Sequence, residues 1–232
     1  MELLNSLVGQ INDILWSYVL IILLIGAGII FTIRTKFVQI RFIKEMIRLI
    51  AGDAGNKMEG QQISSFQAFC VSTASRVGVG NIAGIAIAVV LGGPGAIFWM
   101  WIIAILGSAT GFVESTLAQI YKVPRTDSNG YLGGPAYYIN NALHSPKTAV
   151  FFAILISITY GLIFNSVQSN TISLSLQTAF NFDATMIGIV IAVFSGIVVF
   201  GGLHRIAKVT EYMVPIMAGI YLLIAFAITI YN

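Results

Sequence analysis

The chain has 232 residues, of which 57% are hydrophobic and only 9% are charged. An ordinary soluble domain carries roughly a quarter of charged residues, so this composition predicts a protein of the lipid bilayer. Cys70 is the only cysteine and there are two histidines, which excludes an internal disulfide, a cysteine-based metal cluster and a histidine-rich zinc site. The net charge of +3 would suit a nucleic acid only if the basic residues lined one solvated face.

The N-terminal region is predicted to contain one membrane helix. Residues 14–33 are an apolar run closed by Arg34, and a bilayer needs about 20 such residues per helix. Glu2 and Asp13 precede the run where a cleavable signal would carry basic residues, so we expect the segment to remain as a membrane helix.

An interfacial helix is predicted to follow. Residues 35–50 combine basic and apolar side chains at helical spacing, which indicates an amphipathic helix lying on the membrane. Residues 51–60 are a short polar connector. We therefore expect residues 1–60 to form an N-terminal region and residues 61–232 to form the core.

The first core span is predicted to be broken. Residues 64–91 are long and apolar, but the segment Arg76-Val77-Gly78-Val79-Gly80-Asn81 interrupts them near the middle. We expect one span made of two half-helices. A tight turn at 92–95 and a span at 96–121, with tryptophans near its start, would complete a membrane hairpin.

The remaining core elements are predicted in chain order. They are a polar loop at 122–132, a short helix at 133–141, and spans at 148–180, 184–200 and 212–230. Together with the earlier segments, these make six predicted spans, and the fold class is an all-α integral membrane protein.

The basic residues predict the orientation in the membrane. If the N-terminus lies outside, all lysines and arginines except Arg76 fall on the inner side, as the positive-inside rule requires. They are Arg34, Lys36, Arg41, Lys44, Arg48, Lys57, Lys122, Arg125, Lys147, Arg205 and Lys208. Topology therefore explains the basic charge, and nucleic-acid binding is not expected.

The break in the first core span is the predicted chemical centre. An interrupted backbone at membrane depth leaves carbonyl and amide groups unpaired, which is unfavourable unless a ligand binds them. Carbonyls near Ala74 and Val77 could coordinate a cation, and amides at 79–81 could bind a carboxylate. The alternative is a glycine-rich packing patch, for which Gly80 and Gly84 have the right spacing.

A charged residue also lies at this depth. Arg76 is about 18 Å into its span at 1.5 Å per residue, where a charge costs at least ~2.5 kcal/mol. We expect it to form a gating or structural ion pair with Glu114 of the next span. The alternative, that Glu114 is merely solvated at the inner interface, stays open.

Polar residues on the third core span form a second candidate ligand surface. Gly161, Asn165 and Gln168 fall on one helical face, which could bind a ligand or make interhelical hydrogen bonds. Glu211 is expected to be an interfacial charge near Arg205 and Lys208 rather than a proton carrier.

Several of these segments resemble a known family. The resemblance rests on Ser72-Thr73-Ala74-Ser75-Arg76-Val77-Gly78-Val79-Gly80-Asn81-Ile82-Ala83-Gly84 and on residues 92–101, 133–138, 165–170 and 201–207. These segments are similar to the alanine or glycine:cation symporters, also called sodium:alanine symporters.

The resemblance implies a sodium-coupled importer of alanine or glycine in the cell membrane, with sodium as the coupling ion and no organic cofactor. It implies the five-plus-five inverted-repeat fold of amino acid transporters, with one five-helix repeat here preceded by an extra helix. Ala74 and Val77 would offer carbonyls to sodium. Substrate contacts would come from Thr73, Gly78, Val79, Gly80, Asn81, Asn165 and Gln168.

One departure from the family is its length. Family members are roughly twice as long, so the second repeat is absent and we expect a longer parent chain or a second chain to supply it. The alternative is a truncated or non-transporting membrane subunit that keeps the half-fold. A membrane enzyme is not expected, because no nucleophile, base and orienting residue occur together at membrane depth.

Overall fold

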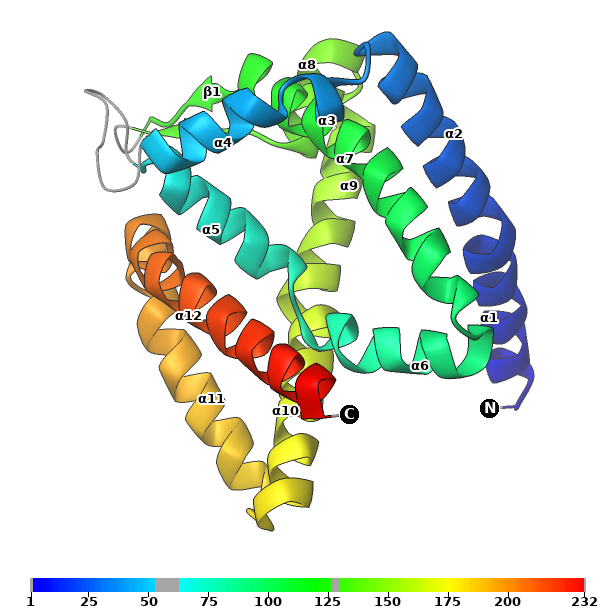
Figure 1. The fold of residues 1–232 in the computed structure, drawn as a ribbon. Coiled ribbons are helices and arrows are strands. Elements are labelled where there is room, and N and C mark those ends of the chain that lie inside the picture. The colour runs from blue at the N-terminus through cyan, green and yellow to red at the C-terminus, as the bar shows by residue number, and fades with distance from the viewer. Residues whose placement is uncertain (1, 53–62, 127–129, 232) are drawn as a thin grey trace. The chain divides into compact units, whose positions relative to one another are not determined.

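The computed structural model of the chain describes residues 2–52, 63–126 and 130–231, most of which are helical (Figure 1). The chain divides into two compact units. The N-terminal unit comprises Met1–Lys44 and Ala88–Ile154, and the broken-helix unit comprises Glu45–Ile87 and Leu155–Asn232.

The helices have the length and composition of membrane spans. In the described part of the chain, four helices are long and apolar enough to cross a membrane, and a bent pair raises the number to five. The four are Asn5–Arg34, Gly95–Ile120, Pro146–Phe180 and Gly202–Tyr231. The chain is therefore a multi-pass membrane protein.

The N-terminal unit is built around two long helices. Its elements are α1 (Glu2–Ile14), η1 (Leu15–Val19), α2 (Leu20–Arg34), α3 (Val38–Arg41), α7 (Gly95–Ile120), β1 (Val123–Pro124), β2 (Tyr131–Leu132) and α8 (Pro135–Leu143). Helix α2 packs against α7, and α3 and α8 also contact α7. The first span thus starts well before residue 14, because the preceding turns continue the same helix.

Helices α2 and α7 approach closely at a glycine. A Cβ at Gly28 would lie 2.8 Å from Cβ of Leu106 and 3.3 Å from the Leu106 carbonyl carbon. Gly28 is buried. Glycine therefore permits this contact between the helices, as small residues do in membrane bundles.

The predicted amphipathic helix at 35–50 is wrong as one continuous element. The structure has α3 and α4 (Ile43–Gly52) instead. Lys36 and Phe37 have φ values of 54° and 57°, a left-handed conformation that delays the start of the helix to Val38. At Phe42, φ of −105° and ψ of 14° leave the helical region and separate α3 from α4. Residues 53–60 of the predicted connector, and the proposed boundary after residue 60, lie outside the described residues.

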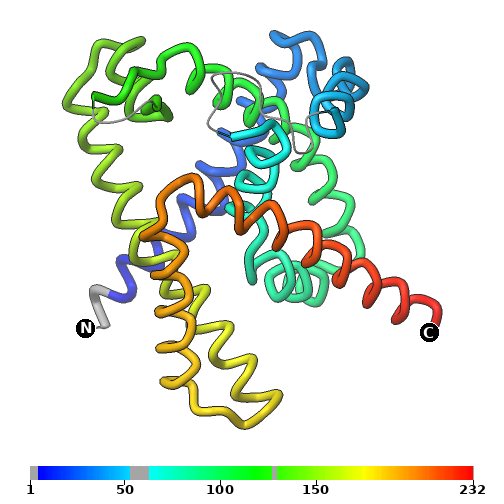
Figure 2. The backbone as a smooth tube through the Cα atoms, turned by 90° about the vertical axis from the view of Figure 1, so that its left-hand side faces the viewer, coloured from blue at the N-terminus to red at the C-terminus, as the bar shows by residue number. Residues whose placement is uncertain are grey.

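The broken-helix unit contains the interrupted span and the C-terminal helices. Its elements are α5 (Ser65–Arg76), η2 (Val79–Asn81), η3 (Thr159–Phe164), α10 (Asn165–Phe180), α11 (Ala184–Val199) and α12 (Gly202–Tyr231). Helix α5 packs against α12, and α10 packs against α11. Figure 2 shows α10 and α11, in yellow and orange, running side by side from a short turn.

Three helices cross a boundary between the units. They are α4, α6 (Ala83–Gly92) and α9 (Pro146–Ile158). Helix α9, η3 and α10 form one apolar helical stretch of 35 residues, as the long predicted span at 148–180 required.

Two predicted spans differ from the observed helices. Helix α11 has 16 residues and is shorter than the helices long enough to cross a membrane, so the span predicted at 184–200 is not among the candidate spans. Helix α12 begins at Gly202 rather than at Tyr212. Arg205 and Lys208 continue the helix because both residue types favour it. The short pairing of β1 with β2 in the predicted loop was not expected.

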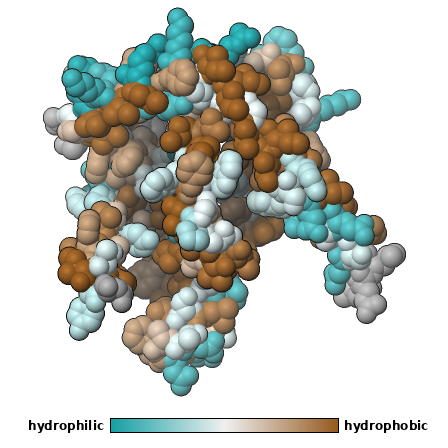
Figure 3. Space-filling view, turned by 45° about the vertical axis from the view of Figure 1, so that its right-hand side comes forward, coloured by the Kyte–Doolittle hydropathy of each residue, from teal (hydrophilic) through white to brown (hydrophobic). Residues whose placement is uncertain are grey.

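Large apolar side chains are mostly exposed (Figure 3). Trp101, Phe194 and Leu23 are 68%, 68% and 64% exposed, which would be unfavourable in water. The buried positions instead include small side chains at helix contacts, such as Cys70 and Ala207. This distribution suits a chain surrounded by lipid or by further helices.

Candidate functional site

The interruption of the first core span lies within the predicted segment. Helix α5 ends at Arg76, and Val77 and Gly78 are extended, with φ values of −94° and −142°. The short helix η2 follows, and the two halves of the span are bent by 72°. The interruption of the helix expected from the sequence is therefore confirmed, and whether the two halves form one membrane span stays a prediction.

The end of α5 presents carbonyl oxygens at the break. The Val77 amide donates to the Thr73 carbonyl at 2.9 Å, which closes the last turn. Among the residues that the structure describes, no group donates a hydrogen bond to the carbonyl of Ala74 or Val77. A helix C-terminus carries partial negative charge, so these oxygens are suited to a cation.

The amides on the other side of the break are partly capped by side chains. The Gly78 amide donates to Oδ1 of Asn81 at 3.2 Å, and the Val79 amide donates to Oε1 of Gln168 at 3.0 Å. The Gly80 amide has no hydrogen-bond acceptor within the described ranges. Two neutral oxygens thus lie where the sequence predicts a carboxylate.

Gln168 also fits closely against the backbone of the break. A Cβ at Gly78 would lie 2.6 Å from Nε2 of Gln168. Glycine at position 78 therefore leaves room for the carboxamide, whose oxygen caps Val79. The sequence placed both residues in the site but did not indicate this contact.

The polar face of the third core span lines a hollow with α11. Gly161, Asn165 and Gln168 all border it, as their spacing predicts. Asn165 Nδ2 donates to the Gly161 carbonyl at 3.2 Å, within a stretch where η3 widens the helix. Such π-helical turns frequently occur at functional sites.

The predicted ion pair between Arg76 and Glu114 stays a prediction. Arg76 belongs to the broken-helix unit and Glu114 to the N-terminal unit. Within its own unit, Glu114 lies near Tyr138 of α8: burial raises the pKa of the Tyr138 phenol, and the Glu114 carboxylate raises it further. Arg76 is exposed.

One contact was missed by the sequence analysis. Nε2 of Gln67 donates to Oε2 of Glu211 at 2.8 Å and joins α5 to α12. The pattern Ser64-x-x-Gln67 is typical of a capping box and predicts the start of α5. It does not indicate a partner 144 residues away.

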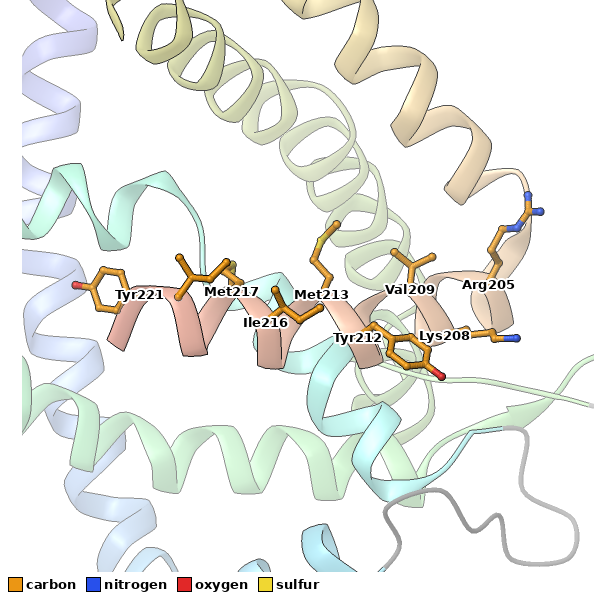
Figure 4. A pocket seen from close by; sticks show the side chains of 9 residues that line it. Arg205, Lys208, Val209, Tyr212, Met213, Ile216, Met217 and Tyr221 are labelled. Carbon is orange, nitrogen blue, oxygen red and sulfur yellow. The ribbon is translucent and has the colours of Figure 1, made fainter. Parts of the chain in front are cut away.

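A second hollow of the broken-helix unit follows one side of α12 (Figure 4). It is lined by Arg205, Lys208, Val209, Tyr212, Met213, Ile216, Met217, Ile220 and Tyr221. Arg205 and Lys208 lie at one end and Tyr221 at the other. Arg205 Nη1 donates to the Ile197 carbonyl at 2.8 Å. The lining is too apolar to match both charges of an amino acid.

Comparison with known proteins identifies the family. The model of the Sodium:alanine symporter family matches residues 1–232. The chain belongs to this family. The resemblance predicted from the sequence is thereby confirmed, and the family is one of transporters rather than of enzymes.

Three relatives illustrate the range of the match. The chain is 52% identical over 231 residues to the probable sodium/glutamine symporter GlnT of Bacillus subtilis, covering 100% of the chain and 48% of the relative. It is 49% identical over 229 residues to the amino-acid carrier protein AlsT of the same organism, covering 98% and 48%. It is 37% identical over 232 residues to the sodium/alanine symporter AgcS of Methanococcus maripaludis, covering 98% and 51%. The chain thus spans about half the length of these relatives.

Proposed function

We propose that the chain supplies one half of a sodium-coupled symporter for a small neutral amino acid, alanine or glycine, in the cell membrane, with its N-terminus outside. The observation that carries the proposal is the helix break. There, the carbonyls of Ala74 and Val77, which accept no hydrogen bond from any residue that the structure describes, lie within a few residues of the Val79 and Gly80 amides. One interruption therefore offers groups to a cation and to a carboxylate.

Sodium would bind at the end of α5. The carbonyl oxygens of Ala74 and Val77 would replace part of its hydration shell, and the negative end of the helix dipole would favour its charge. Binding would offset the cost of leaving these carbonyls without hydrogen bonds at membrane depth.

The substrate carboxylate would bind at the start of the second half-span. It would accept hydrogen bonds from the Val79 and Gly80 amides and displace Oε1 of Gln168 from Val79. The Gln168 carboxamide could then donate to the same carboxylate through Nε2. The Val79 amide would thus have a partner with and without substrate, which avoids an unpaired donor.

Other predicted contacts surround these groups. The Thr73 carbonyl, next to Ala74, accepts a hydrogen bond from the Val77 amide. The Asn81 side chain caps the Gly78 amide. Asn165 lies on the same hollow as Gln168 and would contribute polar groups near the substrate. In the complete transporter, Arg76 and Glu114 would form a gating or structural pair.

The remaining half of the site would come from elsewhere. The named relatives are about twice as long as the matched region. Alternating access in such transporters needs two repeats that move around a midplane site. We propose that a second repeat, on a longer polypeptide or a second chain, completes the pathway.

The test is uptake of labelled alanine, glycine and glutamine into proteoliposomes. Two proteins are compared: the 232-residue chain alone, and the joined protein, in which the chain is fused to five further helices that serve as the second repeat. Each is measured with an inward sodium gradient and with an equal choline gradient. Sodium-dependent uptake of alanine or glycine by the joined protein supports the proposal. Accumulation driven equally by choline, or uptake of glutamine alone, contradicts it.

A second candidate function is a non-transporting membrane subunit. A single repeat without a partner lacks the second set of helices that alternating access requires. It predicts no uptake by the isolated chain, and no binding of sodium or alanine by isothermal titration. Binding without uptake would instead support a half-transporter that holds part of the site.

A further inference from the structure

The contact between α5 and α12 has a polar centre surrounded by buried small side chains. Cys70, one turn along α5 from Gln67, is 0% exposed. Ala207 and Val214, on either side of Glu211 along α12, are 0% and 5% exposed. The Gln67–Glu211 hydrogen bond therefore lies within the packed interface of two helices.

Gln67 uses both ends of its side-chain amide. Its Oε1 accepts from the backbone amide of Ser64 at 3.1 Å, and Oγ of Ser64 accepts from the backbone amide of Gln67 at 3.1 Å. Its Nε2 donates to Oε2 of Glu211 at 2.8 Å. Ser64 and Gln67 are 2% and 8% exposed, so little water competes for these bonds. One side chain thus joins the start of α5 to α12.

The same half-helix ends at the proposed ion site. Ten residues, or about 15 Å at 1.5 Å per residue, separate Gln67 from Val77. A rigid helix transmits a change of orientation at its start to its end. The contacts that fix the orientation of α5 near Gln67 therefore also fix the positions of the Ala74 and Val77 carbonyls.

We propose that Glu211 is a positioning residue for the cation site: through Gln67, it fixes the orientation of the half-helix that carries Ala74 and Val77. This inference rests on the proposed function. In this role Glu211 would touch neither the cation nor the substrate and would act by holding α5 against α12. Its carboxylate makes a charge-assisted hydrogen bond, which is stronger than a neutral one.

Cys70 provides a direct measure of this contact. It is the only cysteine of the chain and is fully buried between the helices that the bond joins. In proteoliposomes of the chain joined to a cysteine-free second half, its rate of labelling by N-ethylmaleimide therefore reports separation of α5 from α12. We expect labelling of this joined protein with wild-type Gln67 and Glu211 to slow as sodium is added.

The decisive variants exchange the two partners. Gln67→Glu keeps an acceptor for the capping box, because Glu is a usual residue at that position, but it places two carboxylates together. We expect labelling of Cys70 to rise about tenfold, as the loss of one charge-assisted hydrogen bond implies. The double variant Q67E/E211Q restores a donor and an acceptor, and we expect it to label about as slowly as the wild type.

Sodium dependence distinguishes positioning from mere stabilisation. A positioning role predicts that Q67E needs about tenfold more sodium for half-maximal protection of Cys70, and that Q67E/E211Q restores the wild-type midpoint. Glu45→Gln on α4 removes a carboxylate whose partner is Arg48, and it is expected to change neither labelling nor midpoint.

The outcomes separate the two proposals. No effect of sodium on labelling in the joined protein with wild-type Gln67 and Glu211 overturns the cation site and, with it, the role of Glu211. A normal wild-type response with an unchanged midpoint in Q67E overturns the role of Glu211 alone. If Q67E fails to fold, recovery of folding in Q67E/E211Q supports the pairing, and failure of both variants overturns it.

Discussion

Two glycines, Gly28 in the N-terminal unit and Gly78 in the broken-helix unit, both allow close approach, but they face different neighbours. A Cβ at Gly28 would meet Cβ of Leu106 and its backbone, which cannot move independently of α7. The three atoms nearest to a Cβ at Gly78 would all belong to the end of the Gln168 side chain. The first contact is rigid helix packing, whereas the second can rearrange when a ligand binds.

The largest loss of stability is expected when a methyl group is added at the contact between α2 and α7 in the N-terminal unit. Gly28→Ala is expected to destabilise the chain by about 1–3 kcal/mol relative to Gly26→Ala, because only the first adds a methyl group against Leu106. Gly26 has no atom within 4 Å of an added Cβ, so this control isolates the gain in helix propensity. Thermal unfolding in detergent measures the difference, and equal melting temperatures would contradict the packing.

In the broken-helix unit, a charge at the break should weaken ligand binding. Gln168→Glu gives the Val79 amide a charged acceptor that competes with the substrate carboxylate and repels it. We expect the Kd for alanine to rise at least about tenfold, equivalent to 1.4 kcal/mol. Isothermal titration of the sodium-loaded protein measures it.

The matched control for this change is Gln177→Glu. It adds the same charge to an exposed position of α10, and we expect the Kd for alanine to stay unchanged. If both variants bind alanine equally well, the carboxylate does not bind at Val79.

Loss of the N-cap side chain should destabilise the start of α5 more than the start of α11. Ser64→Ala removes a buried cap and is expected to cost about 1–2 kcal/mol, near the upper part of the usual range. Asp183→Ala removes an exposed cap, whose Oδ1 accepts from the Met186 amide at 2.9 Å, and should cost less. Hydrogen exchange of the first-turn amides compares the two, and a larger effect at α11 would contradict the ranking.

The smallest effect is expected at Gly78 itself. Gly78→Ala should displace the Gln168 carboxamide rather than the backbone, and so expose the Val79 amide to exchange. We expect this amide to exchange about fivefold to tenfold faster, as the loss of one neutral hydrogen bond implies. In a Gln168→Met background the same change should have no further effect, because the acceptor is already absent. Additive effects would show that the two residues are not coupled.

The sequence predicted the elements of the candidate site better than their contacts. The break within 76–81 was predicted because an interrupted apolar run is a local pattern, as are the glycines beside it. Gln168 was placed near the site by spacing along one helix. Its bond to Val79 depends on how two segments 89 residues apart meet, which spacing along the chain does not report.

Some predictions of helix bounds were wrong because the spacing of apolar residues does not report backbone conformation. The helix at 35–50 begins only at Val38, because Lys36 and Phe37 adopt left-handed backbone conformations although neither is a glycine, and it is divided at Phe42, whose φ of −105° and ψ of 14° end α3. The start of α12 was placed at Tyr212 because charged residues precede it. Hydropathy predicts where a helix can contact lipid, but it does not predict where the helix begins.

The sequence by itself determined the membrane composition, the broken span and the family, because apolar length, backbone interruptions and motifs are properties of adjacent residues. Only the tertiary structure decided that Gln168 caps the Val79 amide and that Gln67 binds Glu211. A polar side chain in an apolar interface must find a partner, and which one it finds depends on the packing of helices that are distant in the chain.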